Sequence, residues 1–337
     1  MSQWKQRAEE LAFVNGWSWR KIAEEVGIAK STVSDYLRKK AASRSVEAPI
    51  VETVFPTSVE VSIRELIQNH VKSQNQGIYK KDTWKEDNSG ALKIAVVADT
   101  QCKPTESLEY MKWIGGYIND KRPDVIVHIG DNYDMPSLSS YDKGKKSFEG
   151  RRLKEDLEAG TRGLQLLENE LQYNPRKVFC LGNHESRIDR VANEMPELDG
   201  FIGVDMLPLK AFGWEVVPFL KPIDIGGILF VHYLANPFTG KPYSGTALSQ
   251  LKTVGKSFVV GHKQCLDIAI RNILDGSSQL GIINGACYPF EEEYKGYQGN
   301  AHFRGITMLH EVKDGFGLPM PVSLDYMKEK YLKKNFT

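Results

Sequence analysis

The stretch Lys93-Ile94-Ala95-Val96-Val97-Ala98-Asp99-Thr100-Gln101 decides the fold. Its apolar run stops abruptly at an aspartate, which is typical of a strand that is buried on both faces in a parallel sheet. Ligands and metal ions bind outside the carboxyl ends of such strands. The sequence therefore predicts that Asp99 lies in a functional site.

The same pattern returns four times further along the chain. Each time an apolar run ends in residues that can bind a metal ion or transfer a proton, namely Gly130-Asp131, Gly182-Asn183-His184-Glu185, Val231-His232 and Gly261-His262. Strands are predicted at 93–98, 124–129 and 177–181, with amphipathic helices at 105–120 and 151–172 between them. This β-α-β-α-β order indicates a layered α/β domain. More closely spaced strands are predicted after residue 212, at 214–218, 228–232, 257–260 and 280–284, and they indicate a second sheet packed on the first.

The composition is that of a globular chain. It has 337 residues, of which 41% are hydrophobic and 26% charged, with a net charge of +1. That charge excludes a chain that is basic throughout. No apolar run approaches the roughly 18 residues of a membrane span, and the start of the chain lacks an apolar signal core, so a cytoplasmic location and no membrane partner are expected. The four cysteines are far apart and predict neither disulfides nor a zinc site.

Three regions are predicted: 1–42, 43–90 and 91–337. The first reads as short helices, with a tight turn at Gly27 between the last two. The second is a linker with one amphipathic helix at 59–71, and the third is the α/β domain. Residues 1–40 contain eight Lys/Arg and five Asp/Glu, a local net charge of +3 that mildly favours contact with phosphates.

Residues 22–37 resemble the helix-turn-helix of small DNA-binding domains. The resemblance implies that a recognition helix enters the major groove of DNA and presents the side chains of Lys30, Ser31, Ser34 and Arg38. Ala29 stands where a capping serine or threonine is usual, and Asp35 would oppose phosphate contact. The alternative is a three-helix bundle that serves protein contacts or oligomerisation.

The strand-end residues of the α/β domain suit divalent metal ions. The set contains carboxylate, amide and imidazole groups and no thiolate: Asp99, Asp131, Asn183, His232 and His262. Such donors bind Mn²⁺, Mg²⁺, Fe²⁺ or Zn²⁺. Two carboxylates and two histidines exceed one tetrahedral site, so one carboxylate could bridge two ions, and Asp131 on the middle strand is the natural candidate.

The order of these motifs resembles the calcineurin-like metallophosphoesterase superfamily. The family pattern D-x-H, G-D-x-x-D, G-N-H-[ED], H and G-H-x-H is followed in order over about residues 92–290, except that Gln101 and Gln264 replace two of its histidines. The resemblance implies a four-layer α-β-β-α sandwich that hydrolyses phosphoesters with two divalent ions. It implies that Asp131 bridges the ions, that Asn183, His232 and His262 complete one ion site, and that Asp99, Gln101 and Gln264 complete the other.

The resemblance also implies the catalytic roles. His184 would bind the phosphate and protonate the leaving oxygen as general acid, while Asp134 would fix the tautomer of the His184 ring. A hydroxide between the two ions would be the nucleophile. Together with the DNA-binding-like start of the chain, this combination would suit a phage or prophage protein.

Two departures from the family pattern are informative. Gln101 and Gln264 stand where the family has histidines, and an amide oxygen is a harder and weaker ligand than imidazole. The affected site should therefore favour Mn²⁺ or Mg²⁺ over Zn²⁺. The alternative is that this site stays empty and the domain uses one metal ion or is inactive.

The second departure concerns the substrate. Met135-Pro136 follow the G-D-x-x-D motif in place of the Arg-Gly of Ser/Thr protein phosphatases, where the arginine grips the phosphate. Arg187 and Arg190 could replace it, or could be solvated helix residues. We therefore expect a phosphodiesterase, with nucleic acid as a candidate substrate. The alternatives are a phosphomonoesterase, or a DNA-binding regulatory protein with a weakened or inactive esterase domain. The segment 288–303 is predicted to form a loop over the cleft.

Overall fold

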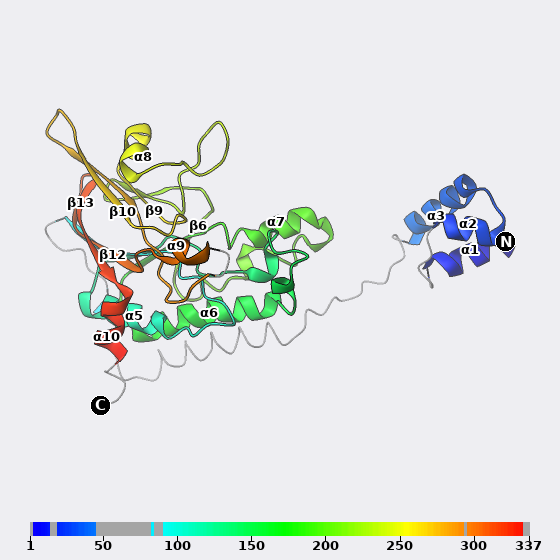
Figure 1. The fold of residues 1–337 in the computed structure, drawn as a ribbon, viewed down its shortest axis with the longest axis horizontal. Coiled ribbons are helices and arrows are strands. Elements are labelled where there is room, and N and C mark those ends of the chain that lie inside the picture. Colours follow the sequence, from blue (N-terminus) through cyan, green and yellow to red (C-terminus); the bar gives the residue numbers. More distant parts are fainter. Residues whose placement is uncertain (1–2, 14–18, 45–81, 84–89, 293–294, 333–337) are drawn as a thin grey trace. The chain divides into compact units, whose positions relative to one another are not determined.

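The computed structural model describes residues 3–13, 19–44, 82–83, 90–292 and 295–332 (Figure 1). The chain divides into two compact units, Met1–Pro56 and Thr57–Thr337. The amphipathic helix predicted at 59–71 lies outside the described residues, as does most of the predicted linker, so the three predicted regions stay a prediction. No helix within the described parts of the chain is long and apolar enough to cross a membrane.

The described residues of the first unit form three helices, α1 (Gln3–Phe13), α2 (Trp19–Val26) and α3 (Lys30–Arg44). They enclose a small core of Ala8, Leu11, Ile22, Ala23, Val33 and Leu37. Gly27 has a φ of 64° and turns the chain between α2 and α3, as its position in the sequence predicts. The helices lie where the sequence predicts helices, whereas DNA binding stays a prediction.

The second unit is built on a six-stranded sheet in the order β13-β12-β2-β3-β5-β6. The strands β2 (Leu92–Val97), β3 (Val125–His128), β5 (Arg176–Cys180) and β6 (Glu215–Val217) run parallel to one another. Two antiparallel strands, β12 (Gly305–Lys313) and β13 (Phe316–Ser323), extend the sheet beyond β2. The strand β3 therefore occupies the middle of the parallel part, as the sequence predicts for the strand before Asp131.

A second sheet has five strands in the order β10-β11-β9-β8-β7. Its three inner strands β8 (Ile228–Phe230), β9 (Phe258–Val260) and β11 (Ser278–Ile283) are parallel. The edge strands β7 (Ile223–Ile225) and β10 (Asp267–Asn272) are antiparallel to their neighbours. The second sheet was therefore predicted correctly, although its two edge strands were not.

The two sheets lie face to face between helices. Ile94, Val96 and Ala98 point into the core between the sheets, while Ala95 and Val97 of the same strand pack under the helices. This two-sided burial explains why the 93–98 run has no polar alternation. The outer helices are α5 (Tyr110–Lys121), α6 (Leu153–Glu170) and α10 (Leu324–Leu332) on the first sheet and α8 (Ala247–Val254) on the second (Figure 1). The predicted four-layer α-β-β-α sandwich is confirmed.

Three details of the prediction were wrong. The strand predicted at 214–218 belongs to the first sheet, because β6 pairs with β5. The predicted polar linker contributes a two-residue strand, β1 (Asp82–Thr83), that pairs with β4 (Tyr173–Asn174). The strands β12 and β13 were not predicted, although they return the end of the chain to the first sheet.

Candidate active site

The candidate site lies at the carboxyl ends of parallel strands from both sheets. Asp99, Asp131 and Asn183 follow β2, β3 and β5 of the first sheet. His232 and His262 follow β8 and β9 of the second sheet. The strand ends of both sheets meet at one edge of the sandwich, so five distant points of the sequence supply one constellation of polar groups.

The backbone of the site is unusual. Five residues with predicted metal-binding roles have positive φ angles, namely Asp99 (48°), Gln101 (44°), Asp131 (54°), His262 (67°) and Gln264 (58°). Left-handed backbone is disfavoured for residues with a Cβ and costs about 1–3 kcal/mol per position. The fold therefore holds the backbone at these five positions in a strained conformation.

Two motif glycines are required by close contacts. A Cβ on Gly182 would lie 2.2 Å from Oδ1 of Asp131, and a Cβ on Gly261 would lie 2.6 Å from Oδ2 of Asp99. Neither glycine has a positive φ, so the requirement is for space and not for conformational freedom. The glycines of the G-N-H and G-H motifs thus let the next strand approach each carboxylate.

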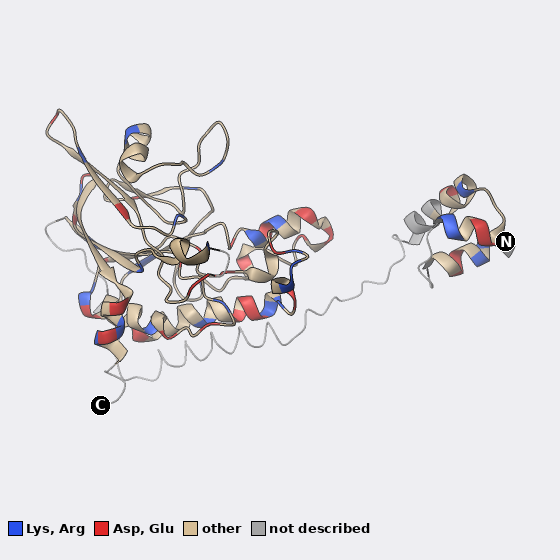
Figure 2. Cartoon of the chain, viewed as in Figure 1, with Lys and Arg blue, Asp and Glu red and all other residues tan. Residues whose placement is uncertain are grey.

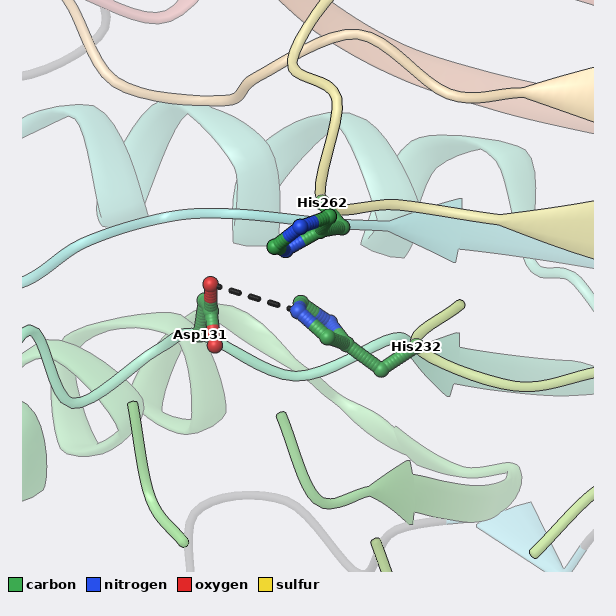
Figure 3. Close-up of side chains that lie close together, drawn as sticks. All are labelled: Asp131, His232 and His262. Carbon is green, nitrogen blue, oxygen red and sulfur yellow. Dashed lines mark ion pairs between the residues drawn. The ribbon is translucent and has the colours of Figure 1, made fainter. Parts of the chain in front are cut away.

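Asp131, His232 and His262 point toward one another (Figure 3), and Asn183 joins this cluster through contacts with both histidines. Nε2 of His232 lies 3.3 Å from Oδ2 of Asp131 and 2.8 Å from Oδ1 of Asn183. Nδ1 of His262 lies 2.8 Å from the same Asn183 oxygen. Potential ligand atoms of Asp131, His232 and His262 all lie within 4.8 Å of one another, which is the spacing that a shared metal ion needs.

The tautomer of His232 is fixed from behind. Its Nδ1 lies 2.7 Å from the carbonyl oxygen of Ile129, so this nitrogen carries the hydrogen and donates it. Nε2 is therefore left to face the oxygens of Asp131 and Asn183, which is the arrangement of a metal-binding histidine. A cation fits between these three groups, because it would take the place of the proton on Nε2 and attract the ring nitrogen and both oxygens.

Burial and charge shift the pKa values in this cluster strongly. Burial and the Asp131 charge raise the pKa of Asp99 to about 7. Burial disfavours the charged form of His232, but the Asp131 carboxylate outweighs it and raises the pKa of His232 to about 9. Burial and the neighbouring His232 lower the pKa of His262 to about 4. Carboxylates without enough cationic partners are typical of sites that bind metal ions.

Asp99 and Gln101 differ from the residues of this cluster in their hydrogen bonding. Asp99 accepts the backbone N–H of His262 through Oδ2 at 3.0 Å. Its Oδ1, and both polar atoms of the Gln101 amide, are buried and have no hydrogen-bond partner among the described residues. Burying a polar atom without a hydrogen-bond partner costs free energy. These three atoms are therefore available to bind a ligand, which would offset that cost.

Gln264, the third residue predicted for the same ion, is already engaged. Its Oε1 accepts a hydrogen bond from the Tyr288 hydroxyl at 2.9 Å and another from the ammonium of Lys295. An amide oxygen has two lone pairs, so both are used. The second ion that the sequence predicts would therefore have to do without Gln264 in this arrangement.

His184 lies beside this cluster of potential metal ligands and contacts Asp134. Its Nδ1 is 2.9 Å from Oδ1 of Asp134 and 2.8 Å from the Asp134 carbonyl oxygen, while Nε2 is 3.7 Å from Oδ2 of Asp131. Burial acts to lower the pKa of His184, but the carboxylates of Asp131 and Asp134 raise it above its ordinary value. The structure thus brings together the two residues that were predicted to form the general acid pair.

Glu185 is a site residue whose role sequence reasoning missed. Its buried carboxylate accepts the backbone N–H groups of Gly182, Asp131, Asn132 and Tyr133 at 2.8–2.9 Å. It therefore holds the strained turn that carries Asp131 against the turn that carries Asn183. The signal was present in the sequence, since the G-N-H-E motif contains an acid at this position.

Arg187 and Arg190 do not face the cleft. Nη1 of Arg187 donates to the carbonyl oxygens of Asp134 at 2.8 Å and Met135 at 3.1 Å. Nη2 of Arg190 donates to the carbonyl oxygen of Leu138. Both arginines thus hold the loop after Asp134.

A cleft of about 440 Å³ opens over the cluster. Its lining includes Asp131, His184, His262 and the segment Lys295, Gln298, Gly299, Ala301 and His302 around the short helix α9 (Gly296–Asn300). The predicted loop over the cleft is therefore present within 288–303. Among the residues that line the cleft, Lys263 and Lys295 supply positive charge.

The match to a family model agrees with this geometry. The family model of the calcineurin-like phosphoesterases matches residues 92–302, which is more than half of the chain. The Gene 54 protein of Mycobacterium phage L5 is 30% identical over 175 residues, which are 50% of this chain and 68% of that protein. The Gene 54 protein of Mycobacterium phage D29 is 31% identical over 176 residues, with the same shares. Among solved structures, GAP50, the anchor in the inner membrane complex of Plasmodium, matches with a TM-score of 0.25 and 10% identity over 69% of this chain and 88% of that one.

The sandwich and its strand-end cluster define a metal-dependent hydrolase of phosphoesters. The chain belongs to the calcineurin-like phosphoesterase family. Its similarity to two phage proteins agrees with the expectation of a phage-type protein.

Proposed function

We propose that the domain cleaves phosphodiesters, with nucleic acid as the candidate substrate, and that His184 protonates the leaving oxygen. Asp131, Asn183, His232 and His262 would hold a divalent ion, and their distances support this assignment. A bound divalent ion supplies Lewis-acid stabilisation of the charge on the phosphate. Mn²⁺ is the favoured ion, because the donors are oxygen and imidazole groups, while Mg²⁺, Fe²⁺ and Zn²⁺ fit the same donor types.

One observation carries the preference for a diester. Both Arg187 and Arg190 donate hydrogen bonds to the loop after Asp134 and so are not available to hold a phosphate. A phosphomonoester carries about two charges, and a guanidinium fork is the group best suited to hold it. Both arginines donate to backbone carbonyls of 134–138 instead. The described residues that line the cleft include no arginine. A singly charged diester needs less cationic contact, so it fits this lining better.

His184 and Asp134 would carry the proton transfer. The Asp134 carboxylate fixes the Nδ1 hydrogen of His184, which leaves Nε2 directed toward Asp131 and the cleft. A protonated Nε2 is then placed to donate to an oxygen that leaves the phosphorus. Asp131 also accepts the backbone N–H of His184 through Oδ1 at 2.9 Å, and this hydrogen bond positions the backbone that carries the His184 ring.

Hydrolysis assays on metal-stripped protein test this function. A chromogenic phosphodiester and the corresponding monoester would be compared with Mn²⁺, Mg²⁺ or Zn²⁺ added back, and His184→Ala would serve as the blank. Diester cleavage that Mn²⁺ restores and that the variant lacks would support the proposal. Faster cleavage of the monoester would favour a phosphomonoesterase. No turnover by folded protein with any ion would favour a DNA-binding regulatory role.

We further propose that the first unit binds DNA. Lys30 and Ser31 are exposed at the start of α3 and Ser34 is half-buried one turn on, which supports their predicted contact with DNA, while the side chain of Arg38 lies outside the described part. Lys30→Ala and Arg38→Ala in the full chain should each weaken binding and flatten its salt dependence by about one unit of slope. An unchanged slope in both variants would leave the protein-contact alternative for this unit.

A further inference from the structure

The residues around Gln264 form a polar contact that the metal chemistry does not use. Lys295 donates to Oε1 of Gln264, and it also donates to the Tyr288 hydroxyl at 2.8 Å. Tyr288 in turn donates to the same Gln264 oxygen at 2.9 Å. A half-buried ammonium therefore lies inside the cleft, on the side where the resemblance to the family places the second ion.

This lysine is held in place by the segment that carries it. The side chain of Asn300 accepts the backbone N–H of Glu292 at 2.8 Å and donates to the carbonyl oxygens of Glu292 and Gly296 at 2.9 Å. The Glu292 carboxylate forms an ion pair with Lys103 at 2.9 Å, and both side chains are nearly buried. These contacts close the loop on both sides of Lys295, so its ammonium is positioned and not simply exposed at a loop tip.

The two halves of the site offer unequal sets of donors. Asp131, Asn183, His232 and His262 surround one position with four donor groups. On the other side, both lone pairs of the Gln264 oxygen are used. Among the described residues there, Asp99 Oδ1 and Gln101 Oε1 are the side-chain oxygens that have no hydrogen-bond partner. A second divalent ion there would also sit beside a positive ammonium, which repels it.

We propose that the Lys295 ammonium takes the place of the second metal ion, so that the domain binds one divalent ion and uses Lys295 as the second positive charge facing the phosphate. This inference rests on the proposed hydrolysis. It explains why glutamines, which can accept from an ammonium, stand where the family has imidazoles: a neutral imidazole at position 264 would offer one lone pair, and the amide oxygen offers two. Lys295 is thus a substrate-positioning residue as well as a substitute for an ion.

Counting bound ions tests the inference without recourse to activity. Metal-stripped full-length protein would be titrated with Mn²⁺, bound metal would be measured after equilibrium dialysis, and electron paramagnetic resonance would distinguish isolated from exchange-coupled Mn²⁺. Wild-type protein should bind one isolated ion per chain. Lys295→Met should bind two coupled ions, because the variant removes the repelling charge and frees one lone pair of Gln264.

Two matched variants control for charge and position. Lys295→Arg retains the positive charge and should keep one ion. Lys263→Met removes another lysine of the same cleft, whose ammonium donates to the Gly245 carbonyl oxygen, and should also keep one ion. Two coupled ions in wild-type protein, or one ion in both wild type and Lys295→Met, would overturn the inference.

The same experiment separates this inference from the proposed function. One isolated ion in a wild-type protein that cleaves no phosphoester would leave the ion count standing and refute the hydrolysis. Two coupled ions in a protein that cleaves diesters would refute the one-ion inference and leave the proposed hydrolysis standing. Wild-type protein that binds no Mn²⁺ at all would overturn the ion count, and the assays with Mg²⁺ and Zn²⁺ would then decide on the hydrolysis.

Discussion

Oε2 of Glu185 accepts the backbone N–H of Asp131 at 2.9 Å, and it accepts that of Gly182 at 2.8 Å. Oε1 accepts two more N–H groups from Asn132 and Tyr133. One buried carboxylate therefore joins two turns of the site that are about fifty residues apart in sequence, and it offsets the strain of the left-handed Asp131 backbone.

Glu185→Gln should destabilise the domain by about 2–5 kcal/mol, because the new NH₂ group would face two N–H donors and leave them unsatisfied. Urea unfolding of the metal-free protein measures this change in the free energy of unfolding. Glu197→Gln, at an exposed position, should change it by less than about 0.5 kcal/mol. Equal stabilities of the two variants would mean that Glu185 does not hold the turns.

Gly182→Ala should weaken metal binding by about 10- to 100-fold, because its Cβ would lie 2.2 Å from Oδ1 of Asp131 and displace that carboxylate. Titration calorimetry with Mn²⁺ measures the affinity. Gly203→Ala is the matched control, since the one atom its Cβ would approach more closely than ordinary contact is a side-chain oxygen of the exposed Asp205, at 2.5 Å. A loss of affinity in the control as large as in Gly182→Ala would contradict the steric argument.

Asp134→Asn should move the alkaline fall of the pH–rate profile to lower pH. Burial opposes protonation of His184, but the carboxylates of Asp131 and Asp134 raise its pKa, and a general acid is active below its pKa. Removal of one carboxylate lowers that pKa, so activity should be lost earlier as the pH rises. The measurement needs a diester with a strongly basic leaving group, for which general acid catalysis contributes about 10²–10⁴-fold.

The control for this shift is Asp142→Asn. The Asp142 carboxylate pairs with Arg151 at 2.8 Å in the segment that follows Asp134, away from the His184 ring and its partner Asp134. Its variant should keep the wild-type profile. A profile of Asp134→Asn that falls in rate at all pH values without moving would contradict a role of Asp134 in the protonation of His184.

Asp156→Asn should stabilise the metal-free protein at alkaline pH by about 2 kcal/mol. Burial raises the pKa of Asp156 to about 6, above the value of 3.8 for an unperturbed carboxyl. Its protonated form is therefore favoured by folding. That contribution to stability is complete below about pH 4 and is lost as the pH rises through about 6, where the carboxylate becomes charged in a buried position.

Urea unfolding at pH 4 and pH 8 checks the sign of this effect. The gain in Asp156→Asn should appear at pH 8 and vanish near pH 4, because an amide can still accept the Ser137 N–H that Oδ2 of Asp156 accepts at 2.9 Å. Glu155→Gln, at the exposed neighbouring position, should show no such dependence. A gain of the same size at both pH values would rule out the titration of Asp156 as its cause.

Sequence reasoning found the strand ends because burial and polarity change at one residue there. Asp99, Asp131, Asn183, His232 and His262 each close an apolar run, and the structure brings them together. Sequence could not find Lys295, because it is 31 residues from Gln264 in a segment without a motif, and only the folded loop brings the two side chains together. The positive φ angles of Asp99 and Asp131 were equally hidden, since nothing in an aspartate indicates them.

The missed strands have a similar explanation. Pro319 and Pro321 interrupt β13 and argue against a strand in a sequence window, yet an edge strand tolerates proline because one row of its N–H groups has no partner. The mistaken placement of β6 arose because strand spacing, from which it was inferred, does not say which sheet a strand joins. Charged residues of both signs are mixed over α6 and α7 (Figure 2), so charge pattern gave no further guide to the site.

The ligand cluster draws on both halves of the sandwich, since Asp131 and Asn183 extend from the first sheet and His232 and His262 from the second. An ion bound by all four would work as a cross-link between the two layers, in addition to the hydrogen bonds that already join their strand ends there. The four residues could then bind the ion only after both sheets have assembled in register. Only a correctly folded chain would then bind the metal ion. Slow release of the ion would make the metal-bound chain kinetically resistant to separation of its two sheets.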